Sequence, residues 1–356
     1  MFDFIDKGII PYISGLYTLP WILVGFIVTA ILERFIDRQI IDKTMRRIGL
    51  VLLYFFIPVL IFRIFLNTTF GMNEMLLVII IICIITSMYL IAYLYARYTV
   101  KSYGYDVFKM SCYIKTMLTN QGRSSAFIGS MMLAVSEFRI PAAMFMAFVG
   151  IGLFAVIPYI LSYMHKKKEG ASNTCDGGLS VFPWYLRLYP WYLLSFVFMG
   201  ILVHALTGFT SKDLGYEVDV VLKLYTSITI PAALYYVGAG IHPSDFKVSE
   251  MKKLIGISRD EGDDHWLWVR RIFILTVFIT PVILVSFFFF LFYFGLIPLS
   301  WFAVITINIF LPVTSTNMFL VPYGIDKKVT AHIVTWTTLI CVPVVVGLII
   351  LFSSLL

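Results

Sequence analysis

The polar runs TNQGRSS (residues 119–125) and PVTSTN (residues 312–317) each interrupt a long hydrophobic stretch, one in each half of the chain. Inside a lipid bilayer, backbone that leaves the helix must find its hydrogen bonds within the protein, so such breaks are tolerated only where they line a cavity. A matched pair of broken helices is typical of the binding site of a transporter. The two runs therefore predict a membrane fold and the position of its site.

The composition agrees with a membrane protein. Hydrophobic residues make up 60% of the chain, charged residues only 13%, and the mean hydropathy is +0.92, which is more apolar than a water-soluble domain. A spanning helix needs about 20 mostly apolar residues. The segments that meet this rule are 13–33, 48–67, 74–96, 108–134, 141–163, 184–207, 218–242, 270–296, 299–323 and 328–353. We therefore expect an all-α membrane protein with ten transmembrane helices.

Lysine and arginine residues indicate the orientation of these helices. We assign 21 of the 27 basic residues to alternate connections, including six that lie within the approximate bounds of a neighbouring span: Lys109, Lys115, Arg187, Arg270, Arg271 and Lys328. The full set of 21 is Arg34, Arg38, Lys43, Arg46, Arg47, Arg97, Lys101, Lys109, Lys115, Lys166, Lys167, Lys168, Arg187, Lys247, Lys252, Lys253, Arg259, Arg270, Arg271, Lys327 and Lys328. By the positive-inside rule these connections are cytoplasmic, and both termini are extracytoplasmic in the cell membrane. The net charge of +7 then requires no nucleic-acid partner.

A polar, glycine-containing linker at 166–183 divides the chain into two five-helix parts, 1–165 and 184–356. Each part carries a proline in the middle of its second expected span, Pro58 and Pro231, and a polar interruption in its fourth. Because five is odd, the two parts insert with opposite topology. The pattern predicts an inverted repeat, in which the broken helices 4 and 9 cross at the site.

The two runs supply the candidate substrate-binding residues. Arg123 is the sharpest signal, because a guanidinium near the middle of a bilayer costs about 2.5–3.5 kcal/mol and should face a cavity or a partner. An alternative role for Arg123 is to brace carbonyl groups of the ninth span or to reach one membrane surface. Gly122 weakens the helix at the first break. The substrate-binding set is Asn120, Gln121, Arg123, Ser124, Ser125, Pro312, Thr314, Ser315, Thr316 and Asn317.

The positive ends of half-helices, together with Arg123, favour a small organic anion as the substrate. No Asp or Glu lies well inside a span, so His204 and His332 are the candidates for proton coupling, although a lone histidine in a helical bundle is more often a satisfied hydrogen-bonding group. Sodium coupling, proton coupling and no coupling all stay open. The four cysteines are scattered, so we expect neither a metal site nor a resident cofactor.

Several motifs resemble those of the auxin efflux carrier family, within the wider group that includes the bile acid/sodium symporters. They are IGLVLLYFFIPVLIFRIF at 48–65, YVGAGI at 236–241 and LPVTSTNMFLVPYGIDKKVTAHIVTWTTLICVPVV at 311–346. The resemblance implies a ten-helix carrier of organic anions such as carboxylates, with Asn120, Gly122 and Gly129 in the first crossover and Pro312 and Asn317 in the second. The first crossover departs from the family pattern, since NQGRSSAFIGSMM is longer, contains Arg123 and lacks the following proline.

The main alternative to a secondary transporter is a membrane receptor or sensor that keeps the transporter fold and binds its ligand without net flux. A channel would need a continuous polar stripe, whereas the polar residues cluster at one depth. We do not expect an enzyme, because no HExxH motif, aspartate pair or Ser/His pair has useful spacing. The expected partners are the small organic anion and the lipid bilayer, with a homodimer left open.

Overall fold

The computed structural model describes residues 2–13, 18, 20–69, 71–126, 128–169, 184–241, 248–257 and 264–356. Regular structure among these residues is helical. By length and composition, seven of the described helices can cross a membrane: Arg38–Leu66, Met72–Lys101, Ser136–Met164, Leu188–Thr207, Tyr216–Ala239, Asp264–Tyr293 and Lys327–Leu355. Trp21–Leu32 and Leu299–Phe310 are shorter apolar helices. The chain is thus all-α, with the helices of a multi-pass membrane protein.

The elements in chain order are α1 (Phe2–Phe4), η1 (Ile5–Ile9), α2 (Ile10–Ile13), α3 (Trp21–Leu32), α4 (Arg38–Val51), η3 (Leu52–Phe56), α5 (Ile57–Leu66), α6 (Met72–Tyr103), α7 (Val107–Thr119), η4 (Gly129–Ala134), η5 (Ser136–Phe138), α8 (Arg139–Ile151), η6 (Gly152–Val156), α9 (Ile157–Glu169), α10 (Trp184–Thr207), η8 (Ser211–Leu214), α11 (Tyr216–Ala239), α12 (Val248–Ile255), α13 (Asp264–Ile274), η10 (Leu275–Ile279), α14 (Thr280–Tyr293), α15 (Leu299–Phe310), η11 (Ser315–Tyr323) and α16 (Lys327–Leu355).

Two helices begin earlier than the hydrophobic pattern indicates. The helix expected from residue 48 starts at Arg38, where the Asp37 side chain caps it by accepting a hydrogen bond from the Gln39 backbone N–H. The helix expected from residue 270 starts at Asp264. In both cases polar residues extend the helix beyond its apolar part, which hydropathy alone does not detect. Of the expected linker, 166–169 belong to α9, and 170–183 lie outside the described residues.

Proline residues shape three of the long helices. The wide π turns η3, η6 and η10 each end two residues before a proline: Pro58, Pro158 and Pro281. Proline has no N–H and its ring clashes with the carbonyl four residues earlier, so the helix widens there. The carbonyl four residues before Pro58 belongs to Tyr54, and it accepts a hydrogen bond from the Tyr192 hydroxyl of α10 at 2.9 Å. The distortion therefore becomes a link between helices.

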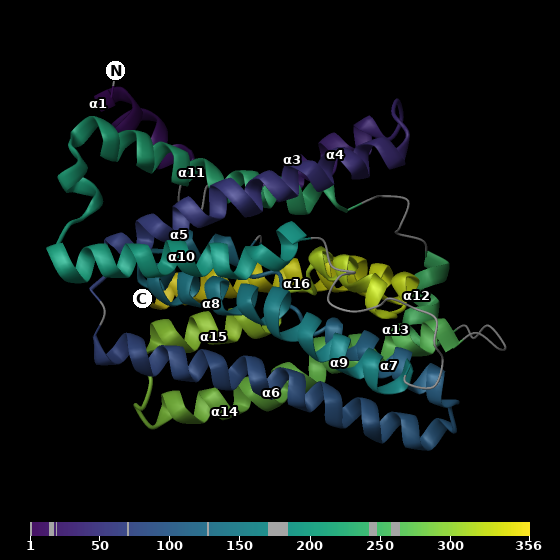
Figure 1. Ribbon diagram of the computed structural model, residues 1–356. Coiled ribbons are helices and arrows are strands. Elements are labelled where there is room, and N and C mark those ends of the chain that lie inside the picture. Colours follow the sequence, from purple (N-terminus) through teal and green to yellow (C-terminus); the bar gives the residue numbers. More distant parts are fainter. Residues whose placement is uncertain are drawn as a thin grey trace.

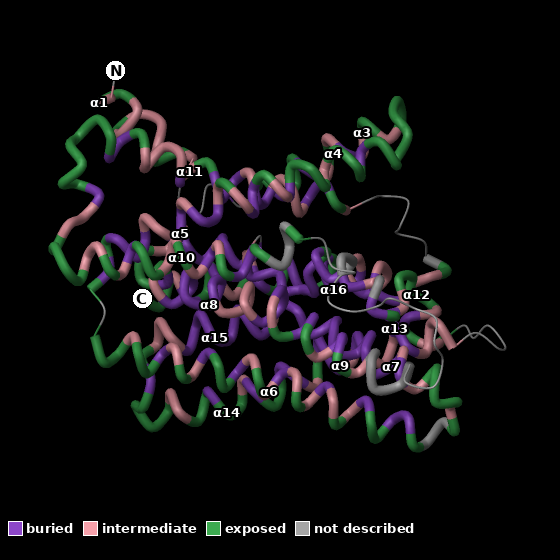
Figure 2. Tube along the Cα trace, viewed as in Figure 1, coloured by how far each residue is buried: buried purple, intermediate pink, exposed green. Residues whose placement is uncertain are grey.

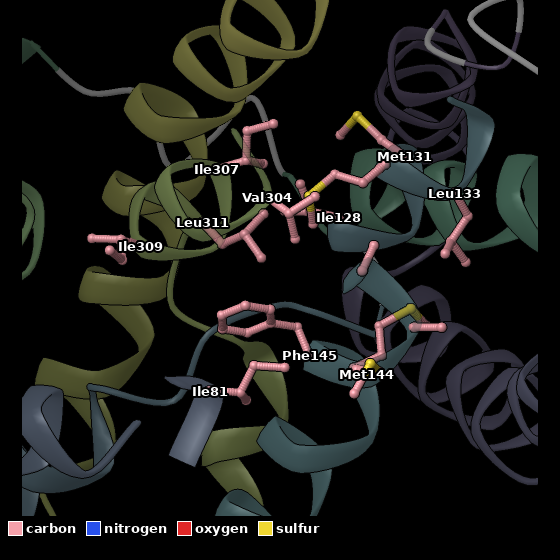
Figure 3. Packing of buried hydrophobic residues seen from close by; sticks show 14 of the residues in the cluster. Ile81, Ile128, Met131, Leu133, Met144, Phe145, Val304, Ile307, Ile309 and Leu311 are labelled. Carbon is pink, nitrogen blue, oxygen red and sulfur yellow. The ribbon is translucent and has the colours of Figure 1, made fainter. Parts of the chain in front are cut away.

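The helices lie side by side in one bundle (Figure 1). The layer formed by α1, α3, α4 and α11 covers one side, α6 and α14 cover the opposite side, and α8, α15 and α16 run between them; both termini lie at the same end. Burial is concentrated in the middle of the bundle, while α6 and α14 are largely exposed along their outer faces (Figure 2). The centre is filled by side chains of α8, of α15 and of the segment that follows the first break (Figure 3).

Two glycines allow helices to pack backbone against backbone. A Cβ at Gly25 of α3 would lie 2.2 Å from the Tyr235 carbonyl oxygen of α11, and a Cβ at Gly200 of α10 would lie 3.0 Å from the Phe62 carbonyl oxygen of α5. Small residues are the usual means of close helix approach in membranes, where dispersion contacts hold helices together. These glycines thus set the distance between α3 and α11 and between α10 and α5.

Gly238→Ala should destabilise the protein, because the added Cβ would lie 1.9 Å from the Ile22 carbonyl oxygen and must push α3 away from α11. Overpacking of this kind costs about 1–3 kcal/mol. Thermal unfolding of the purified protein in detergent measures the effect. Gly347→Ala in α16 is the matched control, since no atom lies within 4 Å of its added Cβ. Equal melting temperatures for the two variants would contradict the packing argument.

Candidate functional site

The two polar runs meet at the centre of the bundle and pair through their backbones. The backbone N–H of Ser124 donates to the Pro312 carbonyl at 2.9 Å, and the N–H of Thr314 donates to the Gly122 carbonyl at 3.0 Å. Arg123 and Val313 thereby form an isolated antiparallel bridge. Helix α7 ends just before this bridge at Thr119, and α15 ends just before it at Phe310. Each break thus supplies the hydrogen bonds that the other needs.

Arg123 is directed at backbone oxygens. Its side chain is buried, with 4% of the residue exposed. One terminal nitrogen, Nη1, donates to the Leu311 carbonyl at 3.3 Å, and Nη2 donates to the Thr276 carbonyl at 3.1 Å. Leu311 lies in the second break, and Thr276 lies in the π turn before Pro281, where helical hydrogen bonding is incomplete. The bracing role considered from the sequence therefore matches these contacts, and the remaining Nε atom has no hydrogen-bond partner among the described residues.

The amides of the first run join it to neighbouring helices. Asn120 donates to the Thr330 hydroxyl of α16 at 3.3 Å, and Gln121 donates to the Thr276 hydroxyl at 3.4 Å. Both side-chain carbonyl oxygens are buried and have no hydrogen-bond partner among the described residues. Ser124 and Ser125 are also buried. Two unpaired oxygens are therefore available to a water, a cation or a hydrogen-bond donor of a ligand.

Ser125 connects the first run to α15, because its hydroxyl donates to Asn308 Oδ1 at 2.9 Å. Gly129 begins η4 immediately beyond the first run, and a Cβ there would lie 3.2 Å from the Leu311 side chain. Both contacts join the segment around the first break to residues at or before the second break. They hold the two interruptions at a fixed separation.

Asn317 is the least satisfied residue of the second run. It is fully buried, and neither its amide nitrogen nor its amide oxygen has a hydrogen-bond partner among the described residues. The amide lies against the first break, since a Cβ added at Gly122 would be 2.7 Å from Asn317 Oδ1. A buried amide without partners is costly unless something binds it. A ligand or an ordered water bound at Asn317 would supply the hydrogen bonds that this amide lacks.

The hydroxyls of the second run lie beside a small cavity. The Oγ1 atoms of Thr314 and Thr316 are 2.9 Å apart, whereas Ser315 is exposed. The cavity measures about 20 Å³, which is room for about one water molecule. Its lining is Leu53, Ile57, Arg123, Ala126, Met146, Val149, Gly150, Leu153, Phe154, Tyr189, Thr314 and Thr316. One polar edge thus faces apolar and aromatic walls.

The other candidates from the sequence lie in the surrounding helices. Pro58 is in α5 and Pro231 is in α11. His204 is in the last turn of α10, where Nδ1 is 3.2 Å from the Phe209 carbonyl oxygen. His332 is in the second turn of α16 and contacts His265. The crossover therefore brings together the residues of the two polar runs, while both histidines lie near helix ends.

The expectation that Lys115 lies in a connection is wrong. It lies in α7 and is buried, and its Nζ donates to the Tyr323 carbonyl at 3.0 Å. Tyr323 is the last residue of η11, so the ammonium group meets the negative end of that helix. Thr276 and Thr330 also hold the crossover in place, although hydroxyls inside apolar helices are too common for the sequence to single them out.

Among known proteins, no family model and no curated relative matches the chain.

Arg123→Ala should lower the melting temperature, because it leaves the Leu311 and Thr276 carbonyls without their side-chain donors. Each unpaired buried group costs about 1–3 kcal/mol. Asn317→Ala is the matched comparison: its amide has no hydrogen bond to lose among the described residues, so stability should be kept or improved. Differential scanning fluorimetry in detergent measures both. A stable Arg123→Ala protein beside an unstable Asn317→Ala protein would reverse these assignments.

Proposed function

We propose that this chain is a secondary transporter that moves a small organic anion by alternating access at the crossover of its two broken helices. The observation that carries the proposal is the buried amide of Asn317, which lies against the first break without a hydrogen-bond partner among the described residues. Its nitrogen can donate to a carboxylate oxygen of the substrate. The two breaks that surround it are the arrangement on which midplane transport sites are built.

Charge and shape around the cavity support an anion with an apolar body. Arg123 lines the cavity and carries the charge nearest to it, while Thr314 and Thr316 add hydroxyl donors at the same edge. Leucine, isoleucine, phenylalanine and tyrosine side chains form the opposite walls. A carboxylate at the polar edge and a hydrocarbon or aromatic group against the walls would satisfy both sides.

Repeated packing supports the ten-span inverted repeat. Gly25 of α3 meets the Tyr235 carbonyl and the Ala239 N–H of α11, and Gly200 of α10 meets the Phe62 carbonyl and the Leu66 N–H of α5. Tyr235 follows Pro231 by the same four residues by which Phe62 follows Pro58, and Ala239 and Leu66 correspond in the same way. The first helix of each half thus packs on the second helix of the other half at equivalent positions, as a two-fold axis in the membrane plane requires.

We also propose, from the motifs at 48–65, 236–241 and 311–346, that the chain belongs to the auxin efflux carrier-like group. In this proposal it lies in the cell membrane with both termini on the extracytoplasmic side, as the distribution of lysine and arginine residues indicates. The common end of the two termini in Figure 1 supports the even number of spans. Because the cavity of about 20 Å³ is too small for an organic anion, one group of helices must rock against the other before the substrate can bind.

Asn317→Ala should abolish transport without loss of folded protein. The purified protein is reconstituted into liposomes, and exchange of a radiolabelled monocarboxylate with an apolar body, such as an indole acid, is measured. Thr338→Ala is the matched control, since this buried hydroxyl of α16 donates to the Val334 carbonyl of its own helix, and it should keep wild-type exchange. Normal exchange by Asn317→Ala would refute the assigned site.

A thermal-shift screen tests the substrate class and the sensor alternative together. Mono- and dicarboxylates, indole acids and bile acids are tested with and without sodium, because a ligand of the folded state raises the melting temperature. We expect stabilisation by an apolar monocarboxylate, lost in Asn317→Ala. Stabilisation only by neutral or cationic compounds would overturn the anion assignment. If an anion stabilises the protein but the reconstituted protein does not exchange it across the liposome membrane, the protein is a sensor.

A further inference from the structure

One wall of the crossover cavity is aromatic and comes partly from α10. Helix α10 lies beside α5 and α8 (Figure 1), and its Tyr189 lines the cavity together with Phe154 of the π turn η6. Tyr189 is buried, with 1% of the residue exposed. In the proposed topology α9 and α10 flank the cytoplasmic linker, and Tyr189 lies in the second turn of α10. The aromatic wall therefore lies on the cytoplasmic side of the crossover.

Two other rings hold the Tyr189 ring edge-on. Its centroid is 5.2 Å from that of Tyr54 in η3 and 4.9 Å from that of Phe154 in η6, each with an interplanar angle of 70°. This geometry is favourable for aromatic pairs. Gly150 leaves room for the ring, since a Cβ there would lie 4.0 Å from Tyr189 Cε1 and 3.2 Å from the Leu193 side chain. The ring thus fills the space between two π turns.

Tyr54 and Tyr189 belong to one group of helices. Tyr192, one turn after Tyr189 in α10, donates its hydroxyl to the Tyr54 carbonyl at 2.9 Å, and the rings of Tyr54 and Tyr192 are 6.0 Å apart. Further along α10, Gly200 brings the helix against the backbone of α5. These contacts hold α10, η3 and α5 together, so Tyr54 should stay with Tyr189 when the group moves.

Phe154 belongs with the crossover. Its neighbour Leu153 lies against the first break, since a Cβ added at Gly122 would be 2.8 Å from Leu153 Cδ1. Helix α8, which continues into η6, contacts both η4 and α15, the elements next to the two breaks. The contact between Tyr189 and Phe154 therefore joins the two groups of helices. The rocking motion of the proposed function must separate these two rings.

The local structure allows that separation. The π turn η6 ends two residues before Pro158, which removes a backbone donor, and π turns are places at which helices bend. A bend at η6 would carry the Phe154 ring away from Tyr189 without unfolding α8. On the polar side of the cavity, backbone hydrogen bonds of Ser124 and Thr314 join the two breaks. The aromatic wall is therefore the side of the cavity that can open at the lower cost.

We propose that Tyr189 and Phe154 form a gate on the cytoplasmic side of the crossover, which closes the cavity while the rings touch and admits the substrate when they separate. The gate rests on the proposed transport function for its purpose, but the barrier itself can be measured without transport. The closed cavity of about 20 Å³ holds about one water molecule. Separation of the rings joins this space to the cytoplasmic side.

The first test measures access to the cavity. Met146 lines the cavity and is 2% exposed, so Met146→Cys reports access in a chain whose four native cysteines are replaced by serine. Inside-out membrane vesicles present the cytoplasmic side to a membrane-impermeant maleimide. Tyr189→Ala should speed labelling about tenfold, because it removes the ring contacts that favour the closed state. Phe154→Ala should act in the same way from the other group, and Tyr189→Phe should leave labelling slow.

Phe196→Ala in α10 is the matched control. Phe196 also packs edge-on against two rings, those of Tyr192 and Phe62, but it is not among the residues that line the cavity, so labelling should stay slow. Unchanged labelling in both Tyr189→Ala and Phe154→Ala would overturn the gate. Equal acceleration by Phe196→Ala would also overturn it, because the cause would be general loosening of α10. Acceleration seen only in right-side-out vesicles would refute the cytoplasmic position.

The second test locks the gate. Tyr189→Cys and Phe154→Cys are combined in the same cysteine-free background and joined by a bifunctional methanethiosulfonate, and exchange of the radiolabelled monocarboxylate by liposomes is measured. Cross-linking should stop exchange, and reduction should restore it. Full exchange by the cross-linked protein would overturn the gate. A protein that exchanges no anion even before cross-linking would refute the proposed function, while faster maleimide labelling in Tyr189→Ala would still support the gate.

Discussion

Every backbone N–H and C=O inside a membrane needs a partner within the protein, and the arrangement of this chain follows from how it meets that requirement at two broken helices. Each of the two interruptions provides hydrogen-bond partners for backbone groups of the other. Ser124 and Thr314 exchange backbone hydrogen bonds with Pro312 and Gly122, and the guanidinium of Arg123 takes two further carbonyls. The ammonium group of Lys115 likewise donates a hydrogen bond to the carbonyl of Tyr323 at the end of η11. Some polar groups at the crossover, above all the amide of Asn317, have no hydrogen-bond partner among the described residues. These groups are therefore not needed to hold the fold.

Prolines impose the same requirement on the unbroken helices. The π turns η3 and η10 leave carbonyl groups that a continuous α-helix would have paired, and these oxygens accept from side chains elsewhere in the bundle: Tyr54 accepts from Tyr192, and Thr276 accepts from Arg123. The distortions thereby serve as attachment points between helices. In lipid there is little hydrophobic driving force for helices to associate. The hydrogen bonds at these carbonyls and the close contacts at Gly25 and Gly200 therefore contribute much of the stability of the bundle.

The sequence was informative wherever a single physical rule acted. Apolar runs predicted the seven long helices of the described residues, and the polar runs predicted both breaks, because nothing else at that depth explains consecutive amides and hydroxyls. It was less informative about helix starts, since α4 and α13 extend into polar residues that capping and packing decide. It misplaced Lys115, because a lysine near a helix end has the same sequence signature whether it faces water or a carbonyl. It left the role of Arg123 open between substrate and backbone, a choice that depends on where Thr276 and Leu311 lie in space. The pairing of His265 with His332 joins residues far apart in the chain, which no local pattern predicts.

The exchange of hydrogen bonds between the two breaks also has a consequence for biosynthesis. The ribosome completes Arg123 nearly two hundred residues before Val313, so the first half enters the membrane with its break unpaired and a guanidinium without its carbonyl acceptors. Until the second half is present, that segment lacks the hydrogen-bond partners that lipid cannot supply. A chain that ends between the two halves would keep Arg123 in the bilayer without its acceptors Thr276 and Leu311. We expect such a truncated chain to be degraded by membrane quality-control proteases.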